Sequence, residues 1–284
     1  MTRREPVLSV RDLSVALARR GVRHLLVDGV SFDVDEGECL GILGESGSGK
    51  SMTCKAFMGL LEAEFRIAGS ARFGGRELLS ASRESLRAMR GRDICMILQN
   101  PMTCFDPLYR IGVQMAEGLA VHTRLSRAEI RRKCLETLEL MRIAAPEEVL
   151  LKYPHQLSGG MLQRVMIGLA LVMEPRLIVA DEPTTAIDAV TQFEIVEEFR
   201  RIKRERRTAM IFISHDLGVV SRLADRVVVM RDARICQSGP VREVLLAPGD
   251  AYTRFLVDKK TAVMRRFQDA MHAPLGAACT RKTA

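Results

Sequence analysis

Hydrophobic and polar positions alternate along the first part of the chain, at residues 7–17 and again at 27–37. Alternation with a period of two is typical of strands with one buried face, so both segments are predicted strands. Residues 39–44 form a continuous apolar run, and 50–61 have the pattern of a helix. The chain is therefore expected to begin with a β region that leads into a strand–loop–helix unit.

Apolar strands and amphipathic helices alternate in the second half of the chain. Short apolar runs at 94–98, 176–181 and 209–215 are predicted strands, and 191–207 is a charged amphipathic helix. Residues 225–239 have the pattern of a β-hairpin. Strands that alternate with helices predict a mainly parallel sheet, with ligands bound at the carboxyl ends of its strands.

A helical pattern with few strand signals occupies residues 102–173. Ser126, followed by Glu129 three residues later, has the form of a capping box at a helix start. We therefore expect a helical subdomain inserted into an α/β domain that covers residues 1–257. The remaining residues, 258–284, are expected to be a basic C-terminal tail, in which 261–272 have the pattern of one amphipathic helix.

Composition restricts the class of protein less than the pattern does. The chain has 284 residues, 47% of them hydrophobic, which is enough for a large core. No apolar run approaches the roughly 18–20 residues of a membrane span, and the N-terminus lacks a signal-peptide core. Seven cysteines with no C-x-x-C pair are expected to be reduced, mostly buried thiols.

The formal net charge of +8 leaves the kind of partner open. A basic chain suits nucleic acid, anionic lipid headgroups or nucleotide phosphates, but it equally suits a surface of well-solvated arginines. Aromatic residues make up only 5% of the chain, and tryptophan is absent. This scarcity argues against a nucleic-acid surface on which bases stack.

The sequence GESGSGKS follows the apolar run at 39–44 and fits the pattern G-x-x-x-x-G-K-S. Its glycines allow backbone N–H groups to surround phosphate oxygens. Lys50 supplies a cation to the β- and γ-phosphates, and the Ser51 hydroxyl coordinates Mg²⁺. The predicted nucleotide-binding residues of this segment are Gly44, Glu45, Ser46, Gly47, Ser48, Gly49, Lys50, Ser51 and Met52.

Three predicted strands end in polar residues that would meet at one edge of the sheet. Asp181 ends the strand in LIVADE and is an expected Mg²⁺ ligand, together with Ser51 and Gln99. Glu182 stands where it can act as a general base on water, an effect worth roughly 10²–10⁴ in rate. Gln99 and His215 end the other two strands, and each alone would be an ordinary turn residue. Together they indicate a site.

Ser158, Gly159 and Gly160 open a predicted helix in the sequence LSGGM. These residues are either an ordinary N-cap or a second anion-binding helix start. One bound nucleotide cannot easily use both glycine-rich loops. The second loop is therefore expected to serve a nucleotide held by another subunit.

The ordered set of motifs resembles the nucleotide-binding subunits of ABC transporters. The set is GESGSGKS, Gln99, LSGGM, LIVADE, Asp188 and His215, and the resemblance extends to about residue 257. It implies an α/β fold, the P-loop NTPase ABC cassette, with a mainly parallel core sheet, an N-terminal antiparallel β subdomain and an inserted α-helical subdomain. It also implies a head-to-tail dimer, with each ATP between the phosphate loop of one subunit and the LSGGM of the other.

The resemblance implies a role for several single residues. Gln99 would sense the γ-phosphate, Glu182 would polarise the attacking water, and His215 would hold both. Asp188 would be the dimer-contact aspartate, and Ile187 stands where the family usually has leucine.

One position departs from the family pattern. The family usually stacks adenine on an aromatic residue upstream of the phosphate loop, and the matching place near Leu17 holds none. The candidates for contact with adenine in its place are His24, or an apolar contact from Leu17 or Val22. The departure bears on recognition of the base rather than on phosphate chemistry.

Residues 99–119 and 153–171 are similar to the branch of the family that imports peptides and nickel. In that branch the segment after Gln99 meets a cytoplasmic helix of the permease. Phe105, Pro107 and Leu108 are the candidates for this contact, and local packing is the other interpretation.

Segments 49–60, 186–199 and 261–272 look most like the nickel-importer subunits of this family, including those that serve opine-type metallophores. Many oligopeptide members carry a cysteine-rich extension, whereas only Cys279 lies in this tail. The leading hypothesis is therefore an ATPase that energises uptake of nickel, as the ion or as a metallophore complex. The ATPase of a dipeptide or oligopeptide importer is the alternative.

The resemblance also implies partners and a location. ATP and Mg²⁺ are the expected cofactors, and the chain is expected at the cytoplasmic face of the inner membrane as a peripheral subunit. The expected partners are a second, related ABC ATPase subunit, two integral membrane permease subunits and an extracytoplasmic solute-binding protein, with no nucleic acid.

Two further hypotheses remain. A non-transport ABC protein acting on DNA or ribosomes is permitted by the basic charge, but such proteins usually fuse two cassettes or carry a long coiled coil. An inactive cassette that binds ATP without turnover is opposed by intact Lys50, Glu182 and His215.

Overall fold

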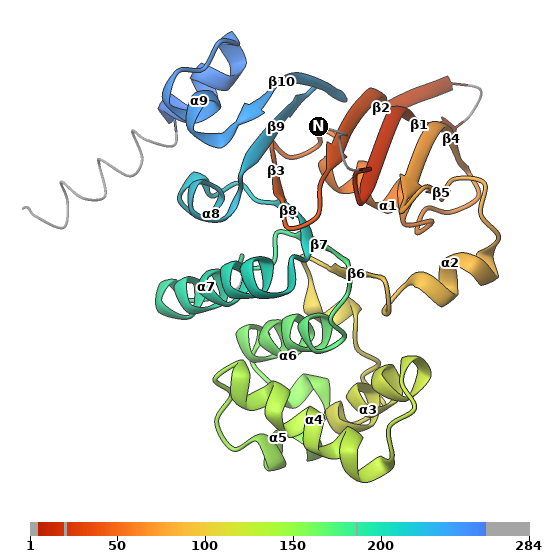
Figure 1. The fold of residues 1–284 in the computed structure, drawn as a ribbon, viewed down its shortest axis with the longest axis vertical. Helices are drawn as coiled ribbons and strands as arrows, with labels where there is room; N and C mark the ends of the chain where they lie inside the picture. Colours follow the sequence, from red (N-terminus) through yellow and green to blue (C-terminus); the bar gives the residue numbers. More distant parts are fainter. Residues whose placement is uncertain (1–4, 20–21, 186, 260–284) are drawn as a thin grey trace, which may run out of the picture.

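Two β-sheets and a set of helices make up this computed structural model, which describes residues 5–19, 22–185 and 187–259 (Figure 1). One sheet has four strands and the other has six. The helix predicted at 261–272, and Cys279, lie outside the described residues.

The four-stranded sheet is antiparallel, in the order β2-β1-β4-β5. Its two long strands are those predicted from the alternation near the N-terminus. The strands are β1 (Leu8–Arg19), β2 (Val22–Val34), β4 (Phe65–Phe73) and β5 (Arg76–Glu77). The sheet is the N-terminal antiparallel β region expected from the sequence, with β4 and β5 added after the first helix.

The six-stranded sheet has the order β10-β9-β3-β8-β7-β6, and all its neighbours are parallel except β10 and β9. Its strands are β3 (Cys39–Leu43), β6 (Ile94–Ile97), β7 (Leu177–Asp181), β8 (Ala209–Ile213), β9 (Arg226–Arg231) and β10 (Arg234–Pro240). The antiparallel β9–β10 pair is the predicted hairpin. The prediction of a mainly parallel core sheet is therefore confirmed.

The core strands are continuously apolar because both faces of the larger sheet are covered. Along β7, Leu177 and Val179 pack in a core shared with the four-stranded sheet, whereas Ile178 and Ala180 pack in a core shared with the helices. All four side chains are almost fully buried. Burial on both faces removes the polar alternation that marks the N-terminal strands.

Helices account for most of the remaining described residues. They are α1 (Lys50–Phe57), α2 (Arg83–Met89), α3 (Ile111–His122), α4 (Arg127–Leu140), α5 (Pro146–Leu151), α6 (Gly159–Val172), α7 (Ala189–Arg206), α8 (Leu217–Leu223) and α9 (Val241–Leu246), with 3₁₀ turns at η1 (Pro101–Thr103) and η2 (Pro154–Gln156). Figure 1 shows α3, α4 and α5 at the end of the molecule away from the four-stranded sheet. In the part of the chain that is described, no helix is both long and apolar enough to cross a membrane.

The four helices α3–α6, here called the helical block, contain the predicted capping box. The Ser126 N–H donates to Glu129 Oε2 at 2.7 Å, which fixes the start of α4. Helices α4 and α6 pack closely at Gly168, where an added Cβ would lie 2.7 Å from Thr137 Cγ2. This close approach holds α6, and the LSGGM sequence at its start, against the rest of the block.

Candidate nucleotide-binding and hydrolysis site

The phosphate loop, residues 44–51, connects β3 to α1 at the carboxyl edge of the parallel sheet. Gly44, Gly47 and Gly49 all have positive φ, of 150°, 83° and 101°. A Cβ on Gly44 would lie 2.3 Å from the Met230 carbonyl oxygen, so no side chain fits there. The glycines therefore allow the tight loop that the sequence motif predicts.

Lys50 is buried at the start of α1, and the carbonyl oxygens of its own loop hold its ammonium group. Its Nζ donates to the carbonyl oxygens of Gly44 at 2.9 Å and Glu45 at 2.8 Å. Burial lowers the pKa of Lys50, against the opposing effect of the Glu182, Asp181 and Glu45 carboxylates. A bound phosphate would favour the charged form that burial disfavours.

Ser51 and Asp181, two of the three predicted Mg²⁺ ligands, are in contact. The Ser51 hydroxyl donates to Asp181 Oδ1 at 2.8 Å, from α1 to the end of β7. Asp181 is only 4% exposed, and burial is the main reason that its pKa is raised. A buried carboxylate beside a hydroxyl suits a hard divalent cation, which takes oxygen ligands. The residues present therefore fit Mg²⁺.

Glu182 brings the other predicted site residues together. Its Oε2 accepts a hydrogen bond from Gln99 Nε2 at 3.0 Å and lies 3.3 Å from His215 Nδ1. Gln99 follows β6, Glu182 follows β7 and His215 follows β8, so three adjacent parallel strands deliver them. The Glu182 backbone has a φ of 48°, in the left-handed region that is costly for residues other than glycine.

The phosphate loop and these strand ends line one cavity of about 440 Å³. Its lining includes Gly44 to Ser46, Gln99, Glu182 and His215. Leu256 and Lys259, from the C-terminal end of the described chain, also line it. The cavity thus joins the residues expected to bind phosphate with those expected to act on water.

Ser158, Gly159 and Gly160 do not line this cavity. They stand at the start of α6, where Ser158 Oγ accepts from the Met161 N–H at 3.2 Å. Ser158 and Gly159 are both exposed. Within this chain the LSGGM sequence caps a helix, and its exposed side remains open to a partner.

Asp188, the expected dimer-contact residue, is the N-cap of α7. Its Oδ1 accepts from the Thr191 N–H at 3.0 Å, and this bond is the main cause of its lowered pKa. The cap fixes the carboxylate at the exposed start of the helix. A structural role within the chain therefore accompanies any contact across a dimer.

At the place where the family usually stacks adenine, Leu17 on β1 pairs with His24 on β2. The Leu17 side chain is half-buried and His24 is exposed. The pair puts an imidazole and an aliphatic side chain together, in place of the usual aromatic residue.

Three residues that the sequence analysis did not single out also belong to the site. The Thr185 hydroxyl donates to Glu182 Oε2 at 3.2 Å. Gln163 on α6 is completely buried, and its Nε2 donates at 2.8 Å to the carbonyl oxygen of Pro183, next to Glu182. Tyr252 accepts from the N–H of Glu45. A glutamine within an otherwise apolar helix face was the available signal for Gln163; nothing local marked the other two.

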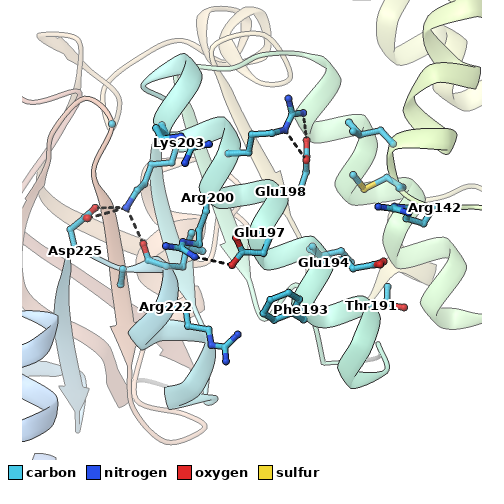
Figure 2. A pocket seen from close by; sticks show the side chains of 18 residues that line it. Arg142, Thr191, Phe193, Glu194, Glu197, Glu198, Arg200, Lys203, Arg222 and Asp225 are labelled. Carbon is cyan, nitrogen blue, oxygen red and sulfur yellow. Dashed lines mark hydrogen bonds and ion pairs between the residues drawn. The ribbon is translucent and has the colours of Figure 1, made fainter.

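A larger groove of about 840 Å³ lies along α7, away from the phosphate loop. Figure 2 shows that its charged side chains pair with one another: Lys203 with Asp225 and Arg200 with Glu197, at 2.9 and 2.8 Å. No residue of the phosphate loop lines it. Several of its charges are thus paired with one another, and the groove lies apart from the phosphate loop, so it is interpreted as a solvated helix face and not as the nucleotide site.

Residues 27–185 match the family model described as ABC transporter. The ATP-binding protein CntD of the metal-staphylopine import system of Staphylococcus aureus is 44% identical over 246 residues, which cover 87% of this chain and 91% of CntD. The oligopeptide transport ATP-binding protein OppD of Salmonella typhimurium is 43% identical over 247 residues, covering 87% of this chain and 74% of OppD.

A solved structure of the ATP-binding cassette MJ0796, dimeric and bound to ADP and Pi, superimposes with a TM-score of 0.76. The two sequences are 25% identical, and the match covers 83% of this chain and 99% of that one. The fold predicted from the sequence is therefore that of known cassettes. The chain belongs to the ABC transporter family.

Proposed function

We propose that this chain is the ATP-hydrolysing subunit of an ABC importer that takes up nickel, as the ion or as a metallophore complex. The observation that carries the enzymatic part is the contact of Glu182 with Gln99 and His215, in the cavity that the phosphate loop lines. An isolated phosphate loop would account for nucleotide binding only, whereas a carboxylate in contact with Gln99 and His215 supports chemistry on water.

The roles of the residues follow from their positions. The phosphate loop and Lys50 bind the β- and γ-phosphates of ATP. Glu182 accepts a proton as a water oxygen bonds to the γ-phosphorus and the bond to the bridging oxygen breaks; Gln99 and His215 orient that water. Ser51, Asp181 and Gln99 would hold Mg²⁺, which would neutralise charge on the phosphates.

A second ATPase subunit is part of the proposal, because Ser158 and Gly159 of the LSGGM sequence are exposed and lie outside the cavity of their own chain. The family resemblance and the dimeric state of the related MJ0796 structure support a head-to-tail pair of this kind. The remaining proposed partners are two permease subunits and a solute-binding protein, with the ATPase at the cytoplasmic face of the inner membrane.

The proposed permease contact lies next to an apolar groove of about 360 Å³ between the helical block and the end of β6. Phe105 lines this groove and is only 8% exposed, which favours local packing for that residue. Leu108 is 78% exposed, and Pro107 is exposed as well. Leu108 and Pro107 are therefore the better candidates for contact with a permease helix.

The substrate is the finer part of the proposal. CntD, named for metal-staphylopine import, supports a metallophore complex. OppD is almost equally similar, so a dipeptide or oligopeptide importer is the second candidate. The transported substrate would not touch this subunit under either candidate, and no nickel ligands are assigned to it.

Uptake measurements in cells that lack the gene for this chain test the proposal. The wild-type chain should restore accumulation of radioactive nickel when the metallophore is supplied, and Glu182→Gln should not. Restored uptake of a labelled dipeptide, without nickel uptake, would establish the second candidate instead.

Purified protein tests the assigned base. Glu182→Gln should lower the ATP turnover roughly 10²–10⁴-fold while ATP binding survives, because the amide cannot accept the proton. Glu194→Gln, an exposed glutamate on α7, is the matched control and should keep the wild-type rate. Unimpaired hydrolysis by Glu182→Gln would refute the assignment.

A further inference from the structure

The C-terminal end of the described chain packs against the phosphate loop. The N–H of Glu45, the second residue of the loop, donates to the phenolic oxygen of Tyr252 at 3.0 Å. The two residues are 207 positions apart in the sequence. Tyr252 is only 7% exposed, so most of its ring is shielded from water.

The contact continues from Tyr252 through Glu45 to Lys50. The carbonyl oxygen of Glu45 accepts a hydrogen bond from Lys50 Nζ at 2.8 Å. Glu45 therefore contacts Tyr252 through its backbone N–H and Lys50 through its backbone carbonyl. A change in the backbone orientation at Glu45 would move the acceptor that holds Lys50.

Tyr252 is itself held firmly. The guanidinium carbon of Arg231 lies 4.9 Å from the centre of the Tyr252 ring, within cation–π distance. The next residue, Thr253, is fully buried, and its N–H donates to Asp250 Oδ1 at 3.0 Å. Leu256, one turn further on, is buried in the core of the helices. The phenolic oxygen is thus a fixed acceptor.

Lys259 also reaches Glu45, but this second contact is weaker. Its Nζ lies 3.6 Å from Glu45 Oε1, and both side chains are more than half exposed. Exposed ion pairs contribute little, typically about 0–1 kcal/mol. Of the two contacts, the hydrogen bond to the buried tyrosine is therefore the stronger one.

We propose that Tyr252 is a positioning residue for ATP binding. By accepting the Glu45 N–H, it holds the start of a loop that three positive-φ glycines leave intrinsically permissive. It thereby keeps the Glu45 carbonyl where it orients Lys50 towards the phosphates. The inference rests on the proposed ATPase function, and it assigns a role to a residue outside the matched segment 27–185.

Tyr252→Phe tests the inference, because it removes the acceptor and keeps the ring beside Arg231. The loss of one hydrogen bond should raise KM for ATP about three- to tenfold and change kcat less than about twofold. Because the packing is unchanged, only the lost hydrogen bond, worth about 1 kcal/mol, should lower the melting temperature, by about 2–4 °C. Tyr153→Phe, which removes a tyrosine hydroxyl in the turn before LSGGM, is the matched control.

A merely structural role for Tyr252 predicts a different result. Tyr252→Phe would then match wild type in KM, and only Tyr252→Leu, which removes the ring, would lower both the melting temperature and the activity. That outcome would overturn the proposal. The dissociation constant of a fluorescent ADP analogue compares nucleotide binding by wild type and Tyr252→Phe without turnover. It is measured well below the melting temperatures of both proteins. It separates failure of this inference from failure of the proposed ATPase function.

Discussion

The Asp181 carboxylate lies buried at the end of β7, and its contact with Ser51 only partly replaces the water it has lost. Burial is the largest cause of its raised pKa, against the lowering effects of the Ser51 hydrogen bond and of Lys55. A carboxyl with a raised pKa binds its proton more tightly in the folded than in the unfolded chain. The free energy of unfolding therefore falls as the pH rises from the ordinary carboxyl pKa, about 3.9, to the raised pKa of the folded chain, and it stays lower above that pH.

Asp181→Asn should therefore stabilise the protein without nucleotide while impairing its ligand site. We expect its melting temperature near about pH 7 to exceed that of wild type by a few degrees, with the difference vanishing below about pH 4. The further stabilisation by Mg²⁺ and ATP, which is large in wild type, should be mostly lost. Thermal melts across pH measure both effects, and a variant that melts below wild type without ligand would contradict the argument.

A residue of the site could be predicted from the sequence only where a local pattern marks it. Lys50, Asp181 and Glu182 stand in motifs whose spacing dictates their chemistry. The structure brings Glu182 into contact with Gln99 and His215, and Asp181 into contact with Ser51. Tyr252 depends on a contact between segments about two hundred residues apart, which no local pattern encodes. The caps, the loop and the strand ends were predictable; this long-range contact was not.

The helices α4 and α6 begin in the same way, each with a serine N-cap. Ser126 Oγ accepts from the Glu129 N–H at 3.4 Å, and Ser158 Oγ accepts from the Met161 N–H at 3.2 Å. Both serines are exposed. They differ in that Ser158 belongs to LSGGM, the sequence proposed to face a nucleotide in another subunit.

This pair separates the cap from the proposed nucleotide contact. Ser126→Ala and Ser158→Ala should each cost about 1 kcal/mol of unfolding free energy, which is about 2–4 °C in melting temperature. Only Ser158→Ala should also lower ATP turnover, because only Ser158 would donate to a phosphate across the dimer. Equal turnover in the two variants would contradict the proposed nucleotide contact and show that Ser158 acts only as a helix cap.

At the level of elements, the strands with a strong pattern were predicted and those without one were missed. The hairpin β9–β10 and the buried strands β7 and β8 follow from apolar runs with clear ends. β4 was not predicted, because most of its residues are exposed and it lacks clear alternation. It is a strand because it pairs with β1, at Leu8 and Phe73 for example, across a long stretch of sequence.

At the scale of the whole molecule, one cavity joins the phosphate loop to Gln99, Glu182 and His215, whereas Ser158 and Gly159 are exposed outside that cavity. A substitution at Gly159 would disable the LSGGM sequence and leave the phosphate loop intact. An added Cβ there would meet no atom within 4 Å, and its backbone does not require glycine. An aspartate at the first position of a helix is compatible with folding, but it would repel the γ-phosphate of a partner's nucleotide.

The expected partner is a related ATPase, so the test is made on the purified chain alone, where activity requires that two copies pair. Mixing two inactive variants then tests whether the site is shared between subunits. Lys50→Met disables the phosphate loop and Gly159→Asp disables LSGGM, so either variant alone should hydrolyse little ATP. In a mixed head-to-tail dimer one site combines both defects and the other has none. An equal mixture should therefore regain about a quarter of the wild-type rate, since half the dimers are mixed and each has one intact site. If the wild-type chain is active alone and the mixture is no faster than its components, the two halves of the site are not contributed by different chains.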